Sequence, residues 1–114
     1  MTINEYFTHY YETVSRGDLD GLDDFFHHDS PVLAGIKAQF EAIRNQLDMS
    51  IQIESVELVA KQEDLLVVRD QILFQGNNKG QVTRNRTGNL FILTRKDKGE
   101  WRVHTTSPLS LEAA

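Results

Sequence analysis

The chain has 114 residues, a length typical of a single domain that buries its own core without disulfides or metal ions. It contains no cysteine, which excludes thiol catalysis, thiolate metal sites and a disulfide framework, and favours a cytoplasmic location. Its 12 basic and 17 acidic residues give a formal net charge of -5, which argues against extended nucleic-acid binding through overall charge.

The N-terminal region lacks a basic segment followed by an apolar stretch, and no apolar run approaches the length of a membrane span. We therefore expect a soluble protein that is not exported and has no membrane partner. Because no repeat, linker or low-complexity tract interrupts the chain, residues 1–114 are expected to form one domain.

The N-terminal part of the chain has the apolar spacing of helices. Thr2 and Glu5 fit a capping box at the start of a first helix, and Gly17 is a suitable left-handed residue to end it. Asp18 is placed to cap a short second helix that ends near residues 27–28. The buried face of the first helix is expected to comprise Ile3, Tyr6, Phe7, Tyr10 and Val14.

A third helix is predicted to end near Leu47. Ser30 followed by Pro31 is a start signal, a hydroxyl cap before a proline at the first helical position, although Gly35 or Ile36 is an alternative start. The apolar residues recur at steps of three and four: Leu33, Ile36, Phe40, Ile43 and Leu47.

From Met49 onwards the pattern alternates as in β-strands. The apolar residues before and after residues 54–55 are out of phase, which indicates a β-bulge in a first, bent strand. A second strand is expected over residues 65–75 and a turn over residues 76–80. The last two strands contain residues 89–94 and 101–106, joined by a turn at residues 96–99.

Helices followed by strands predict an α+β fold in which three N-terminal helices pack on one side of a four-stranded antiparallel sheet. Residues 65–68 and 90–93 are apolar at every position, so both faces of the sheet need cover and a homodimer through the outer sheet face is expected. Of the basic residues, those from Lys79 to Arg102 form either a solvated strand face or an anion-binding surface.

Several short segments resemble the nuclear transport factor 2-like superfamily. They are Arg16-Gly17-Asp18-Leu19-Asp20-Gly21 at the end of the first helix, residues 35–38 at the start of the third, and residues 99–103 near the end. The order of elements agrees over nearly the whole chain. The resemblance implies a cone-shaped, cystatin-like fold in which a curved sheet wraps a long first helix and leaves a pocket. Members include ketosteroid isomerase, SnoaL-like polyketide cyclases, dehydratases, epoxide hydrolases and transport adaptors.

The resemblance to ketosteroid isomerase implies site residues. Tyr10 falls where that family keeps the phenol that hydrogen-bonds the substrate oxyanion, and Asn89 lies close to the position of the assisting acid. The family's catalytic base comes from a hairpin between the second and third helices. That hairpin is shortened here to residues 29–34, so the base has no counterpart.

Turn lengths decide which polar side chains share a sheet face. A two-residue turn at residues 77–78 places Asp70 opposite Asn85 and on the face of Asn89, and a four-residue second turn adds His104. A three-residue loop at residues 77–79 instead pairs Asp70 with Arg86. The resemblance favours the first register, because it also places Asp70 on the pocket side.

In the first register Tyr10, Asp70, Asn89 and His104 converge as ligand-binding candidates in an apolar cavity. Asp70 and His104 are the catalytic candidates as proton carriers, while Tyr10 and Asn89 are suited to stabilise negative charge. The structural alternatives are a core aromatic for Tyr10, an arginine partner for Asp70 and a structural histidine for His104.

We therefore predict a domain that binds a small apolar or amphipathic molecule. The alternatives are an isomerase, cyclase or dehydratase working by acid–base catalysis in the same pocket, and a protein-interaction module using the sheet face with Arg84 and Arg86. No phosphate-binding glycine loop, serine elbow or Walker-type motif occurs, and the adjacent His27 and His28 diverge, so we expect no cofactor, metal or nucleic-acid partner.

Overall fold

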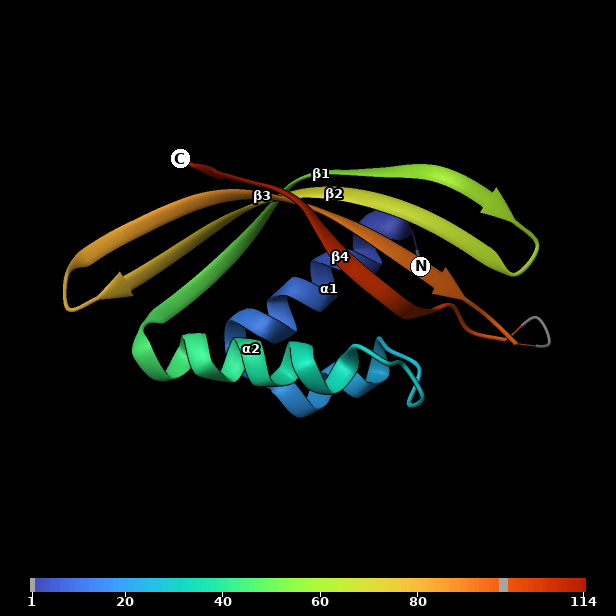
Figure 1. The fold of residues 1–114 in the computed structure, drawn as a ribbon, viewed down its shortest axis with the longest axis horizontal. Coiled ribbons are helices and arrows are strands. Elements are labelled where there is room, and N and C mark those ends of the chain that lie inside the picture. Colours follow the sequence, from blue (N-terminus) through green and yellow to red (C-terminus); the bar gives the residue numbers. More distant parts are fainter. Residues whose placement is uncertain (1, 97–98) are drawn as a thin grey trace.

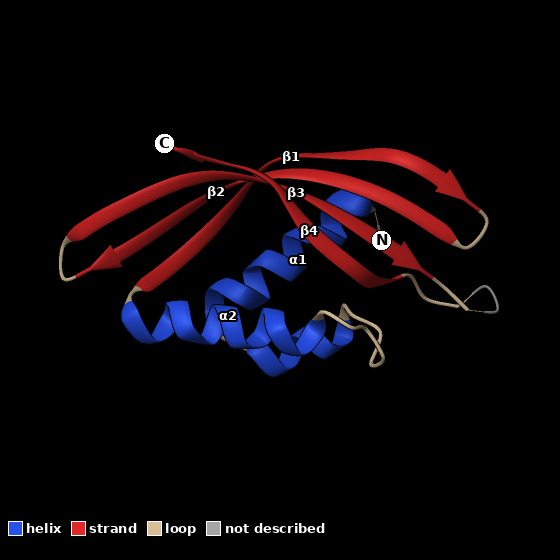
Figure 2. Cartoon of the chain, in the orientation of Figure 1, coloured by secondary structure: helices blue, strands red, loops and turns tan. Residues whose placement is uncertain are grey.

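The computed structural model describes residues 2–96 and 99–114. Its elements follow the order α1 (Ile3–Arg16), η1 (Leu19–Asp24), α2 (Leu33–Gln46), β1 (Asp48–Gln62), β2 (Leu65–Asn78), β3 (Gln81–Thr94) and β4 (Arg102–Ala113). The helices lie beneath one face of a single bent sheet (Figures 1 and 2). The α+β class, the N-terminal helices and the four-stranded antiparallel sheet are confirmed.

The first helix begins and ends where its capping residues predict. The Thr2 hydroxyl accepts a hydrogen bond from the Glu5 amide at 3.1 Å, and the Glu5 carboxylate accepts one from the Thr2 amide. Gly17 ends the helix with a φ of 81°, a conformation that costs little only for glycine. These caps set the bounds of α1 at Ile3 and Arg16.

The second helix is shorter and tighter than an α-helix. It is the 3-10 helix η1, and its Asp18 cap accepts from the Gly21 amide at 3.2 Å. The predicted end near residues 27–28 was too late, because η1 ends at Asp24 and Phe26 already pairs with Val103 of β4 in an isolated bridge.

Helix α2 is held near its two ends. Ser30 does not cap it as predicted; the Ser30 hydroxyl donates to the His104 carbonyl at 2.6 Å, and α2 begins after Val32 without a side-chain cap. At the other end the Arg44 guanidinium donates to the Ser15 carbonyl at 2.8 Å. The helix is therefore fastened to β4 before its start and to α1 near its end.

The strands run in the order β1-β2-β3-β4, each antiparallel to its neighbour. The predicted bulge is confirmed by a shift of pairing between Ile53 and Ser55, and a second shift lies between Leu58 and Ala60. A bulge bends its strand and increases the local twist, so these irregularities account for the curvature of the sheet over α1 (Figure 1).

The pairing of β2 with β3 differs from both predicted registers. Lys79 and Gly80 have φ values of 52° and 90°, so they form the turn, and Asp70 pairs directly with Asn89. The observed turn lies two residues beyond the predicted one, which preserves the alternation of faces. Asp70 therefore shares the face of Asn85 and Asn89 as expected, but its partner is not Asn85.

The last connection is longer than predicted, because Thr94 pairs with Arg102. The centre of the predicted turn at residues 96–99 lies outside the described residues. Further along, Ile92 pairs with Thr105 and Leu93 with Val103. His104 is consequently the additional residue of a bulge in β4, with no partner of its own in β3.

The core lies between α1 and the concave face of the sheet. Phe7 is 0% exposed, and its ring stacks at a tilt on Phe91 of β3 with centroids 4.7 Å apart. The remaining buried apolar residues are Tyr10, Tyr11, Val14, Leu22, Phe26, Met49, Leu66, Val68, Ile72, Leu93 and Val103. Helix α2 contributes no fully buried residue, so it lies above the core rather than within it.

The convex face of the sheet carries apolar and charged residues side by side, with the exposed Arg69 between Val67 and Leu73 along β2. Val67, Leu73, Leu90 and Ile92 alternate with the core residues of β2 and β3 and are half-buried. Ion pairs flank them, among them Arg86 with Glu54 at 2.6 Å. None of the helices in the described part of the chain combines the length and apolar character needed to cross a bilayer.

Replacing Phe7 with alanine tests the location of the core. Phe7→Ala should lower the free energy of unfolding by about 3–5 kcal/mol in urea denaturation, because it opens a cavity at a fully buried position. Val82→Ala, at a position that is 51% exposed, is the control and should change it by less than about 0.5 kcal/mol. Equal effects of the two substitutions would contradict this assignment.

Candidate ligand site

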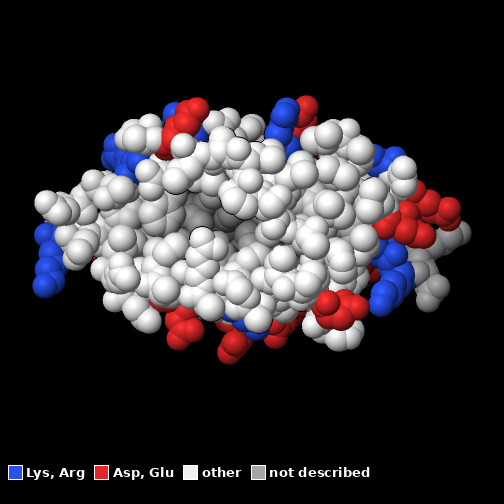
Figure 3. Space-filling model, in the orientation of Figure 1, with Lys and Arg blue, Asp and Glu red and all other residues white. Residues whose placement is uncertain are grey.

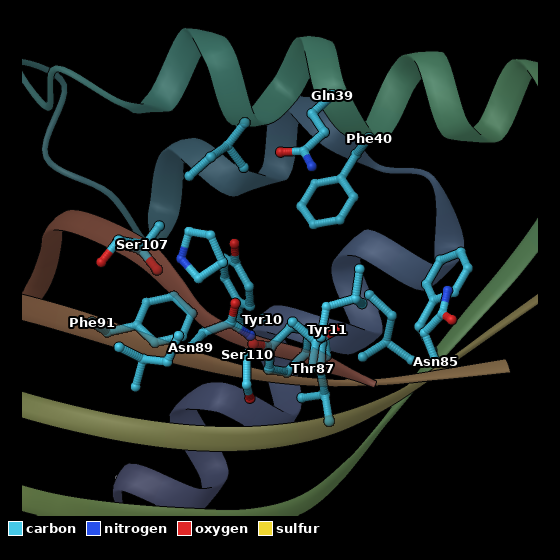
Figure 4. A pocket seen from close by; sticks show the side chains of 18 of the residues that line it. Tyr10, Tyr11, Gln39, Phe40, Asn85, Thr87, Asn89, Phe91, Ser107 and Ser110 are labelled. Carbon is cyan, nitrogen blue, oxygen red and sulfur yellow. The ribbon is translucent and has the colours of Figure 1, made fainter. Parts of the chain in front are cut away.

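A cavity of about 690 Å3 lies under α2, a size within the range of small-molecule sites in proteins. Helices α1 and α2 and all four strands contribute to its lining: Tyr10, Tyr11, Ile36, Gln39, Phe40, Ile43, Ile51, Ile72, Phe74, Asn85, Thr87, Asn89, Phe91, Thr106, Ser107, Pro108, Leu109, Ser110 and Leu111. Gln39 and Phe40 of α2 face Tyr10, Tyr11 and Asn89 across the hollow (Figure 4).

The hollow lies where α2, anchored near its ends and joined to η1 by the ion pair of Lys37 with Asp23, does not pack directly on the sheet. Ile36, Phe40 and Ile43 point from α2 towards the sheet but are only half-buried, since the space below them is not filled by side chains. Phe7 and Phe91 pack together at the side of α1, so the core aromatics do not close the cavity.

Asp70 lies behind the lining and holds two residues of it in place. The Asp70 carboxylate is 2% exposed and accepts hydrogen bonds from the Tyr11 hydroxyl and, at 3.0 Å, from the Asn89 side-chain amide. Tyr11 comes from α1 and Asn89 from β3, so the carboxylate joins the helix to the sheet. Arg86 pairs with Glu54 instead, which overturns the alternative in which Asp70 is an arginine partner.

Burial dominates the electrostatics of this network. It raises the pKa of Asp70 from 3.8 to about 6, although the hydrogen bonds from Tyr11 and Asn89 favour the charged form. Burial and the nearby Asp70 carboxylate also hold the pKa of Tyr11 and of Tyr10 well above the ordinary value of a phenol. Both tyrosines are therefore neutral hydrogen-bond donors at physiological pH.

Tyr10 presents an unused hydroxyl to the cavity. Its side chain is 2% exposed, and no hydrogen bond joins its hydroxyl to another described residue. No polar side-chain atom in the described part of the chain is fully enclosed without a partner. The Tyr10 hydroxyl therefore opens onto the hollow, where it can donate a hydrogen bond to a bound molecule.

The structure brings together three of the four predicted site residues. Tyr10 and Asn89 line the cavity. Asp70 does not line it, but its carboxylate accepts hydrogen bonds from two residues that do, Tyr11 and Asn89. His104 is not among the lining residues; it occupies the β4 bulge, and its carbonyl accepts from Ser30. The predicted convergence of all four side chains was therefore wrong for His104.

Sequence reasoning missed other lining residues. Tyr11 was overlooked, although its spacing of four from Phe7 and three from Val14 also fits the buried face of α1. Asn85 was placed on the inner face by strand alternation but not named as a site residue, whereas Gln39 and residues 107–111 of β4 gave no signal in the sequence. No three His, Cys, Asp or Glu side chains gather as metal ligands do within residues 2–96 and 99–114.

Solved structures share this architecture at low sequence identity. A candidate aromatic ring hydroxylase from Novosphingobium aromaticivorans is 18% identical, with a TM-score of 0.77 over 98% of this chain and 90% of its own. A conserved protein from Planctomyces limnophilus is 15% identical, with a TM-score of 0.73 over 94% of each chain. A candidate scytalone dehydratase from N. aromaticivorans is 15% identical, with a TM-score of 0.72 over 98% and 88%.

These likenesses define the class: an α+β domain with the nuclear transport factor 2-like fold. None of the curated proteins matches the chain. The family model described as the anti-sigma-I factor RsgI9, C-terminal domain, matches residues 6–113, from the first helix to the last strand. The chain belongs to this family.

The Asp70 network predicts a pH dependence of stability. Because the folded-state pKa is raised to about 6, protonated Asp70 stabilises the fold at and below pH 3.8, and this contribution is lost as the pH rises through about 6. A shift of roughly two pKa units corresponds to about 3 kcal/mol.

Urea denaturation of the wild type and of Asp70→Asn between pH 4 and 7.5 checks this. The variant does not ionise at this position, so the stability of the wild type relative to the variant should fall by about 3 kcal/mol across the range. Parallel profiles would show that the carboxyl ionises as freely in the folded chain as in the unfolded one.

Proposed function

We propose that this protein is a small-molecule-binding domain and that its ligand, an apolar or amphipathic molecule, occupies the cavity under α2. One observation carries the proposal: the cavity has unused polar groups set into an apolar wall. Tyr10 offers a free hydroxyl next to Phe91 and across the cavity from Phe40, while Asp70 holds the neighbouring Tyr11 and Asn89 in place. Such a wall with a few oriented polar groups is typical of ligand sites.

Membership of the anti-sigma-I factor family supports binding over turnover. The name of the family's model describes a domain at the C-terminal end of an anti-sigma factor, which is a regulatory protein. Regulation by a small molecule requires that the ligand bind one conformation of the protein more tightly than another. In this proposal a domain with a ligand cavity serves as the sensing part of a larger protein.

A homodimer through the convex sheet face is part of the proposal. The half-buried Val67 and Ile92 pair with each other there, with Leu90 close by, and burying such an apolar patch favours association. The flanking pair of Arg86 and Glu54 is suited to the rim of an interface, where polar groups stay in contact with water. Because the cavity lies on the opposite face, ligand binding and association can occur together.

Acid–base catalysis of the isomerase, cyclase or dehydratase kind is a second candidate, in line with the resemblance to SnoaL-like and ketosteroid isomerase-like enzymes. The observation in its favour is the Asp70 pKa of about 6, a value suited to proton transfer near neutral pH. Since Asp70 does not line the cavity, it would exchange a proton with a ligand through the Tyr11 hydroxyl.

A variant that fills the cavity tests the binding proposal. Ile43→Trp enlarges a lining residue of α2 and should weaken binding of Nile red, an uncharged dye whose emission reports an apolar site, by about tenfold or more, because the indole takes its space. Ala42→Trp adds the same side chain to an exposed position of α2 and is the control. Equal affinities of both variants and the wild type would place the dye elsewhere and contradict the proposal.

Asp70→Asn separates catalysis from binding. Under the second candidate it should lower turnover by a factor of about 100 or more, because the amide cannot take up the proton, while the cavity still binds ligands. Steady-state rates and binding isotherms measured on the same preparation check this. Undiminished turnover would eliminate the catalytic role of Asp70 and leave the binding role intact.

A further inference from the structure

The cavity and its mouth are free of charged side chains. None of the residues that line it is Lys, Arg, Asp, Glu or His. The central hollow in Figure 3 lies in an uncharged face, and the charged residues in that view lie around its rim. The nearest carboxylate in the site, that of Asp70, is covered by its two donors. An ion entering this space would lose its hydration without gaining a partner of opposite charge.

Asp70 decides which end of the Asn89 amide faces the ligand. An ionised carboxylate can only accept hydrogen bonds, so the Asn89 nitrogen must point towards it, and does so at 3.0 Å. The Asn89 side-chain oxygen makes no hydrogen bond to another described residue, and Asn89 lines the cavity. Asn89 therefore presents a hydrogen-bond acceptor to the cavity, and not a donor.

Tyr10 supplies the complementary donor. Tyr10 and Asn89 both belong to the floor of the cavity, on the side opposite Gln39 and Phe40 of α2 (Figure 4). A hydroxyl group satisfies both at once, because its oxygen accepts from Tyr10 and its proton is donated to Asn89. A ketone can accept from Tyr10 but leaves the Asn89 oxygen without a donor, which costs affinity.

We propose that the cavity selects an uncharged molecule with an aromatic or alicyclic body and a hydroxyl group, the hydroxyl being held between Tyr10 and Asn89. Asp70 is a positioning residue in this scheme and acts through the orientation of Asn89. The rings pack against Phe40, Phe74 and Phe91, which line the same space. This inference rests on the proposed binding function and names the class of ligand for that site.

Four ligands with one carbon skeleton test it. Isothermal titration at pH 7.5, above the Asp70 pKa of about 6, compares 9-fluorenol, 9-fluorenone, fluorene and fluorene-9-carboxylate. Fluorenol should bind about threefold to tenfold more tightly than fluorenone, because it makes one hydrogen bond more. Fluorenone should bind more tightly than fluorene by a similar factor, and fluorene-9-carboxylate should have the weakest affinity of the four.

Asp70→Asn should reverse the preference between alcohol and ketone. The oxygen of the introduced side-chain amide keeps the hydrogen bond from Tyr11, so the nitrogen of that amide faces Asn89, and the Asn89 amide must turn to present its own oxygen. The cavity then offers two donors, which a ketone oxygen accepts and an alcohol cannot match without leaving its own proton unpaired. Fluorenone should then bind about threefold to tenfold more tightly than fluorenol.

Tyr10→Phe and Tyr6→Phe form a matched pair. Tyr10→Phe should weaken the binding of fluorenol and of fluorenone about threefold to tenfold and leave the binding of fluorene unchanged, because only the hydrogen-bond donor is removed. Tyr6→Phe removes a hydroxyl that donates to the Phe25 carbonyl and does not line the cavity, so it should alter none of the affinities.

The outcomes separate this inference from the proposed function. If fluorene and fluorenone bind at least as tightly as fluorenol, or if the carboxylate matches fluorenol, the ligand class is wrong and the binding function stands. An unchanged alcohol preference in Asp70→Asn would overturn the positioning role of Asp70. If none of the four binds, both the ligand class and the small-molecule site are refuted.

Discussion

The buried carboxylate of Asp70 is the constraint on which the site depends. A carboxylate is costly to bury, and here hydrogen bonds from Tyr11 of α1 and Asn89 of β3 offset part of the cost. The same bonds fix the rotation of α1 against the sheet and the direction of the Asn89 amide. One group therefore determines both how the helix docks and which atoms face the cavity, so fold and recognition are coupled at this point.

The cavity follows from how α2 is attached. Ser30 and Arg44 hold the helix to β4 and α1 near its two ends, and the bulges of β1 curve the sheet away beneath its middle. Apolar side chains of α2 then reach into the space without filling it. A flat sheet would let the helix pack directly and close the hollow, so the strand irregularities create the site rather than merely distort the sheet.

The structural relatives share the shape of this chain more than its sequence. At 15–18% identity the fold is maintained over nearly the whole length, which requires only that apolar positions, bulges and caps fall at corresponding places. Chemistry is set by the few polar residues that the shape brings into the hollow. For this chain the polar residues that line the hollow are uncharged, and the proposal of a neutral ligand rests on this.

The sequence by itself determined the elements and the faces they bury. The capping box of Thr2 and Glu5, the glycine at the end of α1 and the phase change near residue 54 are local signals, governed by neighbouring residues. The family resemblance chose the register that places Asp70 on the inner face, and strand alternation kept it there although the turn lies two residues further along. Only the tertiary structure decided that Asp70 is hydrogen-bonded to Tyr11 and Asn89, and that a bulge in β4 keeps His104 out of the cavity lining. The reason is that strand register and helix docking depend on contacts between residues far apart in the sequence.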